Sequence, residues 1–215
     1  MAKVATGTYA ELKEQRQRLS SAFTQINGLM ARAGFYLAGL FYVIAPEFIF
    51  LIIGEKWLPM LTVFRLMLLF TLLDPMKNTI GDIFLAIGRP RIVIWISLVQ
   101  LGILLGGLPI AAAIGGIEGV AVVVDTMLVV GITLMLWSAR RYVDYSIRDL
   151  FMRPLMALVA ALTITLAIIS GIDDLSLWIT GTVKIVAFSS VYVIVLLIID
   201  RRMLFSYFQL IKRYI

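Results

Sequence analysis

Long apolar runs, each about the length of one membrane crossing, dominate the chain between residues 33 and 199. A helix needs about 20 apolar residues to cross a hydrocarbon core of ~30 Å. Glycine or proline lies between neighbouring runs, and proline is tolerated at a helix start because the first N–H groups have no partner there. The pattern predicts six transmembrane helices, at about residues 33–53, 59–87, 92–114, 117–138, 154–171 and 177–199.

The segment before the first apolar run has an amphipathic pattern instead. Between residues 8 and 32, apolar side chains recur at helical spacing and basic side chains occupy the opposite side. Thr8 and Glu11 fit a capping box at the start of such a helix. The pattern suits a helix on the headgroup surface, or a solvated cytoplasmic helix that enters the first span. We therefore expect an all-α fold, a polytopic helical membrane bundle preceded by an amphipathic surface helix.

A charged stretch at residues 140–153 interrupts the apolar runs and separates four predicted helices from two. The chain is thus expected to have three parts. A cytoplasmic amphipathic segment covers residues 1–32, and a basic cytoplasmic tail covers residues 200–215. Between them lies a six-helix transmembrane domain, residues 33–199, with four helices in 33–138 and two in 154–199.

Composition supports a lipid environment and excludes several kinds of chemistry. Of the 215 residues, 61% are hydrophobic and 15% are charged, whereas soluble domains carry about 25% charged residues. The absence of cysteine and histidine excludes disulfides, thiolate or imidazole metal sites, and the usual cysteine or serine–histidine catalytic sites. We therefore expect no enzyme, no metal and no cofactor. The net charge of +6 lies in short connections, so it does not indicate binding to nucleic acid.

Lysine and arginine alternate between the two sides of the predicted bundle. Positively charged residues are retained on the cytoplasmic side of short loops. The N-terminal segment, the second and fourth loops and the tail are rich in them, whereas the first loop has only Lys56 and the third and fifth loops have none. The sequence predicts a multi-pass protein of the cell inner membrane with both termini in the cytoplasm.

Seven ionisable residues fall inside the predicted spans: Glu47, Arg65, Asp74, Lys77, Asp82, Asp125 and Lys184. A charge in hydrocarbon costs ~2.5 to 3.5 kcal/mol on insertion scales, so such residues usually face a bundle interior or a watery cavity. The structural alternative for each of them is neutralisation by another charge of the same bundle.

The second predicted span has a polar face. Asp74, Asn78 and Asp82 are four residues apart and so share one side of a helix, with Lys77 three residues from Asp74. Pro75, near the middle of the span, predicts a kink. A kinked, charged helix suits a moving gate. The alternative is that Asp74 and Lys77 pair locally and only help to pack the bundle.

Arg65, Lys184, Asp125 and Glu47 are expected in a layer toward the outer side. They form either interhelical ion pairs or the lining of a vestibule. For Arg65 the vestibule is favoured, because guanidinium binds phosphate oxygens in a bidentate way; for Glu47, which follows a proline, a structural role is favoured. The candidate residues of a transport path are Arg65, Asp74, Lys77, Asn78, Asp82, Asp125 and Lys184.

Short motifs follow one another in a recognisable order over residues 9–137. They are Tyr9-Ala10-Glu11-Leu12, Ala45-Pro46-Glu47-Phe48-Ile49, Ile53-Gly54-Glu55-Lys56-Trp57, Phe64-Arg65-Leu66-Met67, Leu85-Ala86-Ile87-Gly88-Arg89-Pro90 and Gly116-Ile117-Glu118-Gly119-Val120-Ala121. In order and spacing they resemble the oligosaccharide-lipid (O-antigen type) flippases of polysaccharide biosynthesis, in the multidrug/oligosaccharidyl-lipid/polysaccharide exporter superfamily. Residues 138–215 match only as two further apolar helices.

The resemblance implies a carrier that moves a polyprenyl-diphosphate-linked oligosaccharide across a bacterial inner membrane, for surface polysaccharide such as lipopolysaccharide. Members alternate access between two helical lobes, and this chain resembles roughly the last six of about twelve to fourteen spans. The implied partners are the lipid-linked oligosaccharide, membrane lipids and the missing N-terminal lobe or a second chain. The chain is then a fragment, a truncated product or half of a two-chain assembly.

Three rival functions stay open. The first is an exporter of drugs or of a cell-wall precursor from the same superfamily. The second is a membrane enzyme acting on a lipid-linked sugar, which the lack of histidine and the scatter of the carboxylates disfavour. The third is a non-transport membrane assembly subunit, in which the charges inside the spans would only pair with one another.

Overall fold

The computed structural model describes residues 15–171 and 176–200, and all regular secondary structure in these ranges is helical. The main helices are α2 (Arg16–Phe48), α3 (Leu61–Leu66), α4 (Leu68–Ala86), α5 (Pro90–Ala139), α6 (Arg153–Ile169) and α7 (Leu177–Ile199). Short turns of π- or 3₁₀-helix adjoin them at Ile49–Ile53, Glu55–Met60 and Arg148–Met152. The predicted all-α membrane fold is confirmed.

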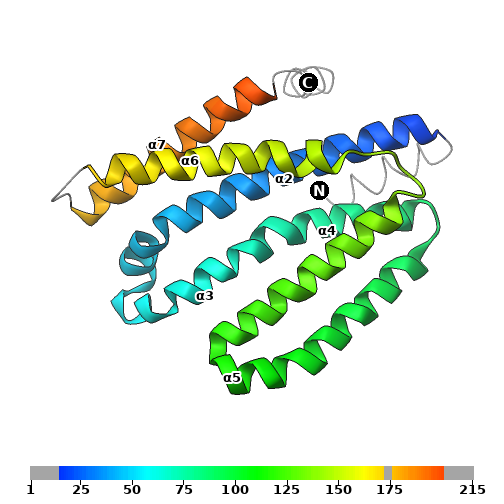
Figure 1. The fold of residues 1–215 in the computed structure, drawn as a ribbon, viewed down its shortest axis with the longest axis horizontal. Helices are drawn as coiled ribbons and strands as arrows, with labels where there is room; N and C mark the ends of the chain where they lie inside the picture. Colours follow the sequence, from blue (N-terminus) through cyan, green and yellow to red (C-terminus); the bar gives the residue numbers. More distant parts are fainter. Residues whose placement is uncertain (1–14, 172–175, 201–215) are drawn as a thin grey trace.

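Four helical segments of the described ranges are long and apolar enough to cross a membrane: Arg16–Ile53, Pro90–Ala139, Arg148–Ile169 and Leu177–Ile199. The segments Glu55–Leu66 and Leu68–Ala86, bent by 42° relative to each other, together form a fifth. A straight helix as long as α5, 50 residues, would measure about 75 Å, which far exceeds a hydrocarbon core of ~30 Å. Instead α5 turns back on itself (Figure 1), and each of its two arms is about the length of one crossing.

The turn of α5 lies at Gly116, whose φ of 54° and ψ of −140° are far from helical values. Glycine adopts a positive φ without the steric cost that a side chain brings. The two arms pack closely after this turn. A Cβ atom on Gly119 would lie 2.4 Å from the carbonyl oxygen of Ala111, and one on Gly107 would lie 2.9 Å from Val123. Small residues therefore allow the hairpin to close.

The helices form two groups joined through α2 and α4 (Figure 1). In one group α6 and α7 pack on each other and on α2, and in the other α4 packs on α5. Buried residues at the junction include Phe23 and Phe35 of α2 and Met76 and Ile80 of α4. Gly39 of α2 admits Phe188 of α7, since a Cβ there would lie 2.5 Å from that ring. Helix α2, which contacts α4, α6 and α7, is thus the central element of the bundle.

The described part of the predicted surface helix is the first half of α2 and is continuous with the first span. No proline lies between Arg16 and Ala45, so nothing in the sequence forces the helix to end at residue 32. Its apolar side is covered by protein. Leu19 and Phe23 are 2% and 0% exposed, and the ring of Phe23 lies 5.4 Å from that of Tyr145 in the α5–α6 connection. Residues 8–14 of the predicted surface helix, and the tail after residue 200, lie outside the described residues.

The bend in the second span lies at Met67, between α3 and α4, whereas α4 runs through Pro75 without a break. A proline ring meets the carbonyl group four residues earlier, so it distorts the turn before it. The bend lies eight residues, about two helical turns, before Pro75, so the prediction of a kink at Pro75 is wrong. Because of the bend at Met67, Arg65 and Asp74 lie on differently oriented helices.

Candidate functional site

A polar strip lies along the open side of α4. Asn78 is exposed, Asp74 and Lys77 are half-buried, and the amide Nδ2 of Asn78 donates to Oδ2 of Asp74 at 3.1 Å. The opposite side of the same helix carries the fully buried Met76 and Ile80. The predicted polar face therefore exists, and it is partly open, with Asn78 its most exposed member.

Lys77 forms no ion pair within the part of the chain that the structure describes. The hydrogen bond of Asp74 goes to Asn78, one residue farther along than Lys77. Local neutralisation of Lys77 by Asp74, the structural alternative, is therefore not the arrangement observed. The ammonium group stays available to an anion from outside the chain.

Asp82 differs from the other three members of this predicted face. It is only 9% exposed, although it follows the exposed Asn78 by four residues. Gly81, Ile83 and Phe84 around it are buried as well, because this end of α4 is enclosed by the bundle. The open strip thus ends at Asn78, and Asp82 is not part of it.

The back of α4 is fixed to α2 at the level of the polar strip. The hydroxyl of Thr79 donates to Oδ1 of Asn27 at 2.7 Å, and Nδ2 of Asn27 donates to the carbonyl of Phe23 at 3.0 Å. Both side chains are buried. Because Thr79 directly follows Asn78, this contact sets the rotation of α4 and so the direction in which Asp74, Lys77 and Asn78 point. The sequence interpretation placed Asn27 on a surface helix and did not predict its contact with Thr79.

Arg65, in the last turn of α3, lies against an aromatic ring of α2. Its guanidinium carbon is 4.7 Å from the ring centre of Tyr42, within the range of a cation–π contact. Its Nε is buried and has no hydrogen-bond partner in the described part of the chain. Tyr42 also lines an apolar pocket of about 180 Å³ between α2, α4 and α6. Arg65 therefore has no ion pair among the described residues, and its observed partner is the ring of Tyr42.

Lys184 forms an ion pair with Glu47, the residue for which the sequence favoured a structural role. Its Nζ lies 2.5 Å from Oε1 of Glu47, which joins α7 to α2, and the two side chains are 12% and 8% exposed. This is the interhelical ion pair that was the alternative to a vestibule. Lys184 has less charge to offer a substrate than Lys77 or Arg65.

Asp125, on the second arm of α5, is 8% exposed, and its Oδ1 has no hydrogen-bond partner in the described ranges. The predicted outer layer of four charges is therefore not one connected network. Glu47 pairs with Lys184, Arg65 lies on Tyr42, and Asp125 has no ion pair with either cation within the described residues.

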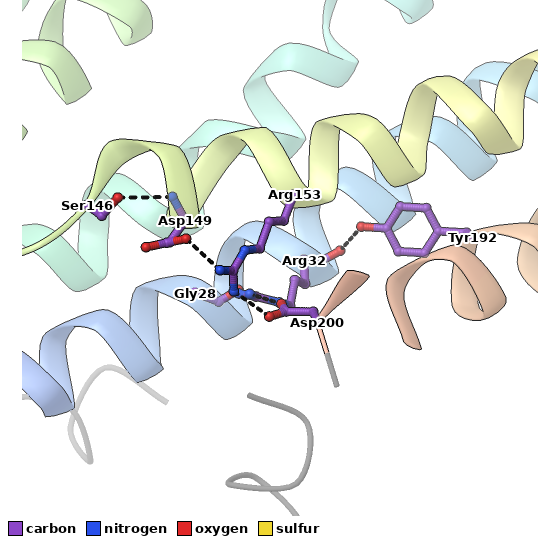
Figure 2. A network of polar contacts seen from close by, with 7 residues as sticks. All are labelled: Gly28, Arg32, Ser146, Asp149, Arg153, Tyr192 and Asp200. Atoms are coloured by element: carbon purple, nitrogen blue, oxygen red, sulfur yellow. Dashed lines mark hydrogen bonds and ion pairs between the residues drawn. The ribbon is translucent and has the colours of Figure 1, made fainter. Parts of the chain in front are cut away.

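A buried charge network at the other end of the bundle was not predicted (Figure 2). Nε of Arg32 donates to Oδ2 of Asp200 at 2.7 Å, and Nη1 of Arg153 donates to Oδ1 of the same carboxylate at 2.7 Å. Arg153 also pairs with Asp149 at 2.8 Å, and the hydroxyl of Tyr192 donates to the carbonyl of Arg32 at 2.8 Å. The network ties α2, α6 and α7 together.

The sequence contains one signal of this network. Asp200 is the only acidic residue after residue 174, at the border of a basic tail. The topology argument counted Arg32 and Arg153 only as cytoplasmic positive charges, because the positive-inside rule does not say which of them are buried. Arg32 is in fact 4% exposed.

Comparison with known proteins gives one match. No protein-family model and no curated protein matches the sequence. Among solved structures, the chain is similar to "Lipid II flippase MurJ, inward closed conformation", with a TM-score of 0.72 over 94% of this chain and 16% sequence identity. At this identity the likeness shows a shared fold. The similar structure is that of a transporter. The chain spans 43% of that protein's length.

Proposed function

We propose that this chain is one part of a flippase that moves a polyprenyl-diphosphate-linked saccharide across a bacterial inner membrane. The observation that carries the proposal is the open strip of Asp74, Lys77 and Asn78 in the middle of a membrane-spanning helix. Charges in contact with lipid are costly, and in membrane proteins they usually border a water-filled cavity or another part of the protein. The fold likeness to a lipid-linked precursor flippase supports a transporter.

The residues of the strip have the chemistry that such a substrate needs. The ammonium group of Lys77 attracts a diphosphate, and Arg65 offers a planar fork that fits phosphate oxygens. The carboxylate of Asp74 and the amide of Asn78 accept and donate hydrogen bonds to sugar hydroxyls. Asp82, Asp125 and Lys184 are buried or paired here, so they contribute to the path only in another conformation of the carrier.

Alternating access requires two opposed halves around a shared cavity. The strip on α4 is partly open, and the chain spans 43% of the similar flippase. We infer that the cavity is completed by an N-terminal lobe or by a second chain. Transport then proceeds by movement of the two halves, without covalent chemistry.

Two substrates are compatible with this mechanism. The motif order over residues 9–137 favours an oligosaccharide destined for surface polysaccharide, such as lipopolysaccharide. The fold likeness favours a cell-wall precursor, since the similar structure is titled a lipid II flippase. The two hypotheses share the diphosphate site and differ in the saccharide that meets Asp74 and Asn78.

Complementation distinguishes these substrates. The chain, co-expressed with its complementary lobe, is introduced into one strain depleted of its lipid II flippase and another lacking its O-antigen flippase. Growth is expected to return in the first strain, or surface polysaccharide in the second, and the chain without the lobe should insert but restore neither. Restored drug resistance alone would indicate a drug exporter. Equal activity of the parent and of the Lys77→Gln/Arg65→Gln variant would favour an assembly subunit and overturn the proposal.

A further inference from the structure

A groove at the arginine-rich end of the bundle is separate from the transport-path residues. It has a volume of about 450 Å³ and lies between α4, the second arm of α5 and the α5–α6 connection. Lining residues include Val129, Thr133, Trp137, Arg140, Tyr145 and Phe151. It extends from the solvent-facing end of α5 into the membrane-spanning part of that helix.

The interior of the groove offers few free polar groups. The hydroxyl of Thr133 donates to the carbonyl of Val129 at 2.7 Å, and the hydroxyl of Tyr145 donates to the carbonyl of Leu136 at 2.6 Å. Both hydroxyls are therefore satisfied within the protein, and little polarity is left to attract a polar solute. The walls suit a hydrocarbon chain.

Arg140 lines the groove, and the neighbouring Arg141 lies over the ring of the lining residue Trp137. The guanidinium of Arg140 lies 5.9 Å from the ring centre of Tyr145, and that of Arg141 lies 5.7 Å from the ring of Trp137. The nearest acid in sequence, Asp144, is already engaged by Arg16 through two hydrogen bonds, of 2.8 and 3.1 Å. No ion pair involves Arg140 or Arg141 in the described ranges, so the mouth is positively charged.

The depth of the groove matches one leaflet. At 1.5 Å per residue, Val129 lies about 16 Å deeper along α5 than Arg140, which is about half of a hydrocarbon core of ~30 Å. An apolar channel one leaflet deep, with arginines at headgroup level, complements a lipid with an anionic headgroup. Basic pockets on the cytoplasmic side of membrane helices bind such headgroups.

We propose that this groove is a binding site for an anionic phospholipid of the leaflet at this end of the bundle. One acyl chain lies between α4 and the second arm of α5, and the phosphate contacts Arg140 and Arg141. The site does not depend on the proposed transport function. By the predicted topology the leaflet is the cytoplasmic one.

Trp137 provides a probe inside the site, because it lines the groove and is 63% exposed. A full-length variant with Trp57→Phe, Trp95→Phe and Trp178→Phe keeps it as the sole tryptophan. The variant is reconstituted in phosphatidylcholine vesicles that contain brominated phosphatidylglycerol or, in a parallel sample, brominated phosphatidylcholine. Trp137 fluorescence is expected to be quenched at a lower mole fraction of the brominated phosphatidylglycerol.

Matched variants separate a site from general attraction to the surface. The double variant Arg140→Gln/Arg141→Gln should have a lower relative affinity for phosphatidylglycerol, by about fivefold for each arginine removed. The double variant Arg140→Lys/Arg141→Lys should keep most of the affinity of the parent. Arg89→Gln/Arg91→Gln removes two exposed arginines of another connection and should change little. Thr133→Phe fills the groove and should abolish the preference with both arginines present.

Three results would overturn the proposal. Equal quenching by both brominated lipids in the parent would mean that no anionic lipid is selected. Weak quenching by both would mean that protein, such as a second copy or another lobe, covers the groove. An unchanged preference in Thr133→Phe would reduce the effect to surface electrostatics. Circular dichroism identifies any variant that fails to fold. The substitutions of Arg140 and Arg141 test the headgroup contact, and Thr133→Phe tests the acyl-chain contact independently.

Discussion

Arg32 of α2 and Asp200, directly after α7, form a buried ion pair although 168 positions separate them in the sequence. Arg32 is 4% exposed and Asp200 is 1% exposed. Arg153 of α6 binds the second oxygen of the same carboxylate at 2.7 Å (Figure 2). One carboxylate thus holds three helices together at one end of the bundle.

Asp200→Asn should strongly destabilise the bundle. It leaves Arg32 buried without a counter-charge, and loss of one partner of a buried pair costs about 3 to 5 kcal/mol. The matched control is Asp149→Asn, because the Arg153–Asp149 pair is 37% and 40% exposed and pairs of this kind contribute about 0 to 1 kcal/mol. Urea unfolding of both purified variants in detergent measures the difference. Similar losses in the two variants would show that Asp200 is not the central residue of the network.

The Glu47–Lys184 pair permits a test of structure against transport. Lys184→Met alone should lower stability by about 3 to 5 kcal/mol, since it leaves Glu47 buried and unpaired. The double variant Glu47→Leu/Lys184→Met should recover most of this loss, because apolar replacements of buried pairs are often neutral. If the pair is only structural, the double variant also transports normally in the two-lobed assembly. A stable double variant without transport would indicate that Lys184 belongs to the transport path.

Hydropathy predicted most of the fold, because each long apolar run needs lipid or protein around it and a helix satisfies its own backbone. The turn at Gly116, between two of the predicted spans, follows from this pattern. The continuity of α2 was missed, since an amphipathic segment can meet either headgroups or protein, and here Phe23 packs against Tyr145. Which of the two covers a helix depends on segments far away in the sequence.

Pairing was the less predictable part of the candidate site. Spacing along α4 allowed Asp74 to meet Lys77 or Asn78, and both offsets place the side chains on one face. The structure selects Asn78. Spacing likewise does not reveal that Glu47 meets Lys184 or that Asp200 meets Arg32, because those contacts depend on how distant helices pack. A sequence periodicity identifies a face of a helix but not the neighbour of that face.

Tyr145 predicts a dependence of stability on alkaline pH. Burial raises the pKa of this phenol above its ordinary value, and the opposing effect of Arg140 is smaller. A raised folded-state pKa means that its contribution is complete below pH ~10, the unfolded pKa, and is lost as the pH rises through the folded one. Tyr145→Phe should therefore lower stability by about 1 kcal/mol near neutral pH, with a smaller difference above pH 10.

Thermal unfolding of the parent and Tyr145→Phe between pH 7 and 11 measures this effect. Tyr142→Phe is the matched control, because no hydrogen bond of the Tyr142 hydroxyl is present in the described part of the chain. A constant difference between the parent and Tyr145→Phe over the whole pH range would contradict the assignment of the hydrogen bond with Leu136.

Single cysteines test the predicted topology directly, because the chain has none of its own. Lys56→Cys and Glu118→Cys, in the first and third loops, should react with an impermeant maleimide in intact cells. Arg141→Cys, in the fourth loop, should react only after permeabilisation, because arginine-rich connections stay in the cytoplasm. The opposite labelling pattern would reverse the orientation and move the proposed lipid site to the outer leaflet.

Lys77 and Arg65 allow the sharpest test of the proposed substrate site. Lys77 has no ion pair with Asp74, whose carboxylate is bound by Asn78. If a substrate diphosphate is its counter-ion, the swap Asp74→Lys/Lys77→Asp should fold and reach the membrane but transport poorly, since the position of a cation matters to a bound anion. If Asp74 and Lys77 only neutralise each other, the swap should restore the transport that each single change loses.

Arg65 adds a graded version of the same test. Arg65→Lys keeps the charge and the contact with Tyr42 but loses the bidentate fork, whereas Arg65→Gln loses both. A charge-assisted hydrogen bond contributes about 1.5 to 3 kcal/mol, so transport per molecule should fall about 10- to 100-fold in Arg65→Gln and less in Arg65→Lys. The complete two-lobed assembly is expressed, its membrane level is measured by blot, and its transport is compared with that of Arg91→Gln, an exposed arginine at the start of α5. Equal transport per molecule in Arg65→Gln, Arg91→Gln and the parent would show that Arg65 only packs against Tyr42 and does not bind the diphosphate.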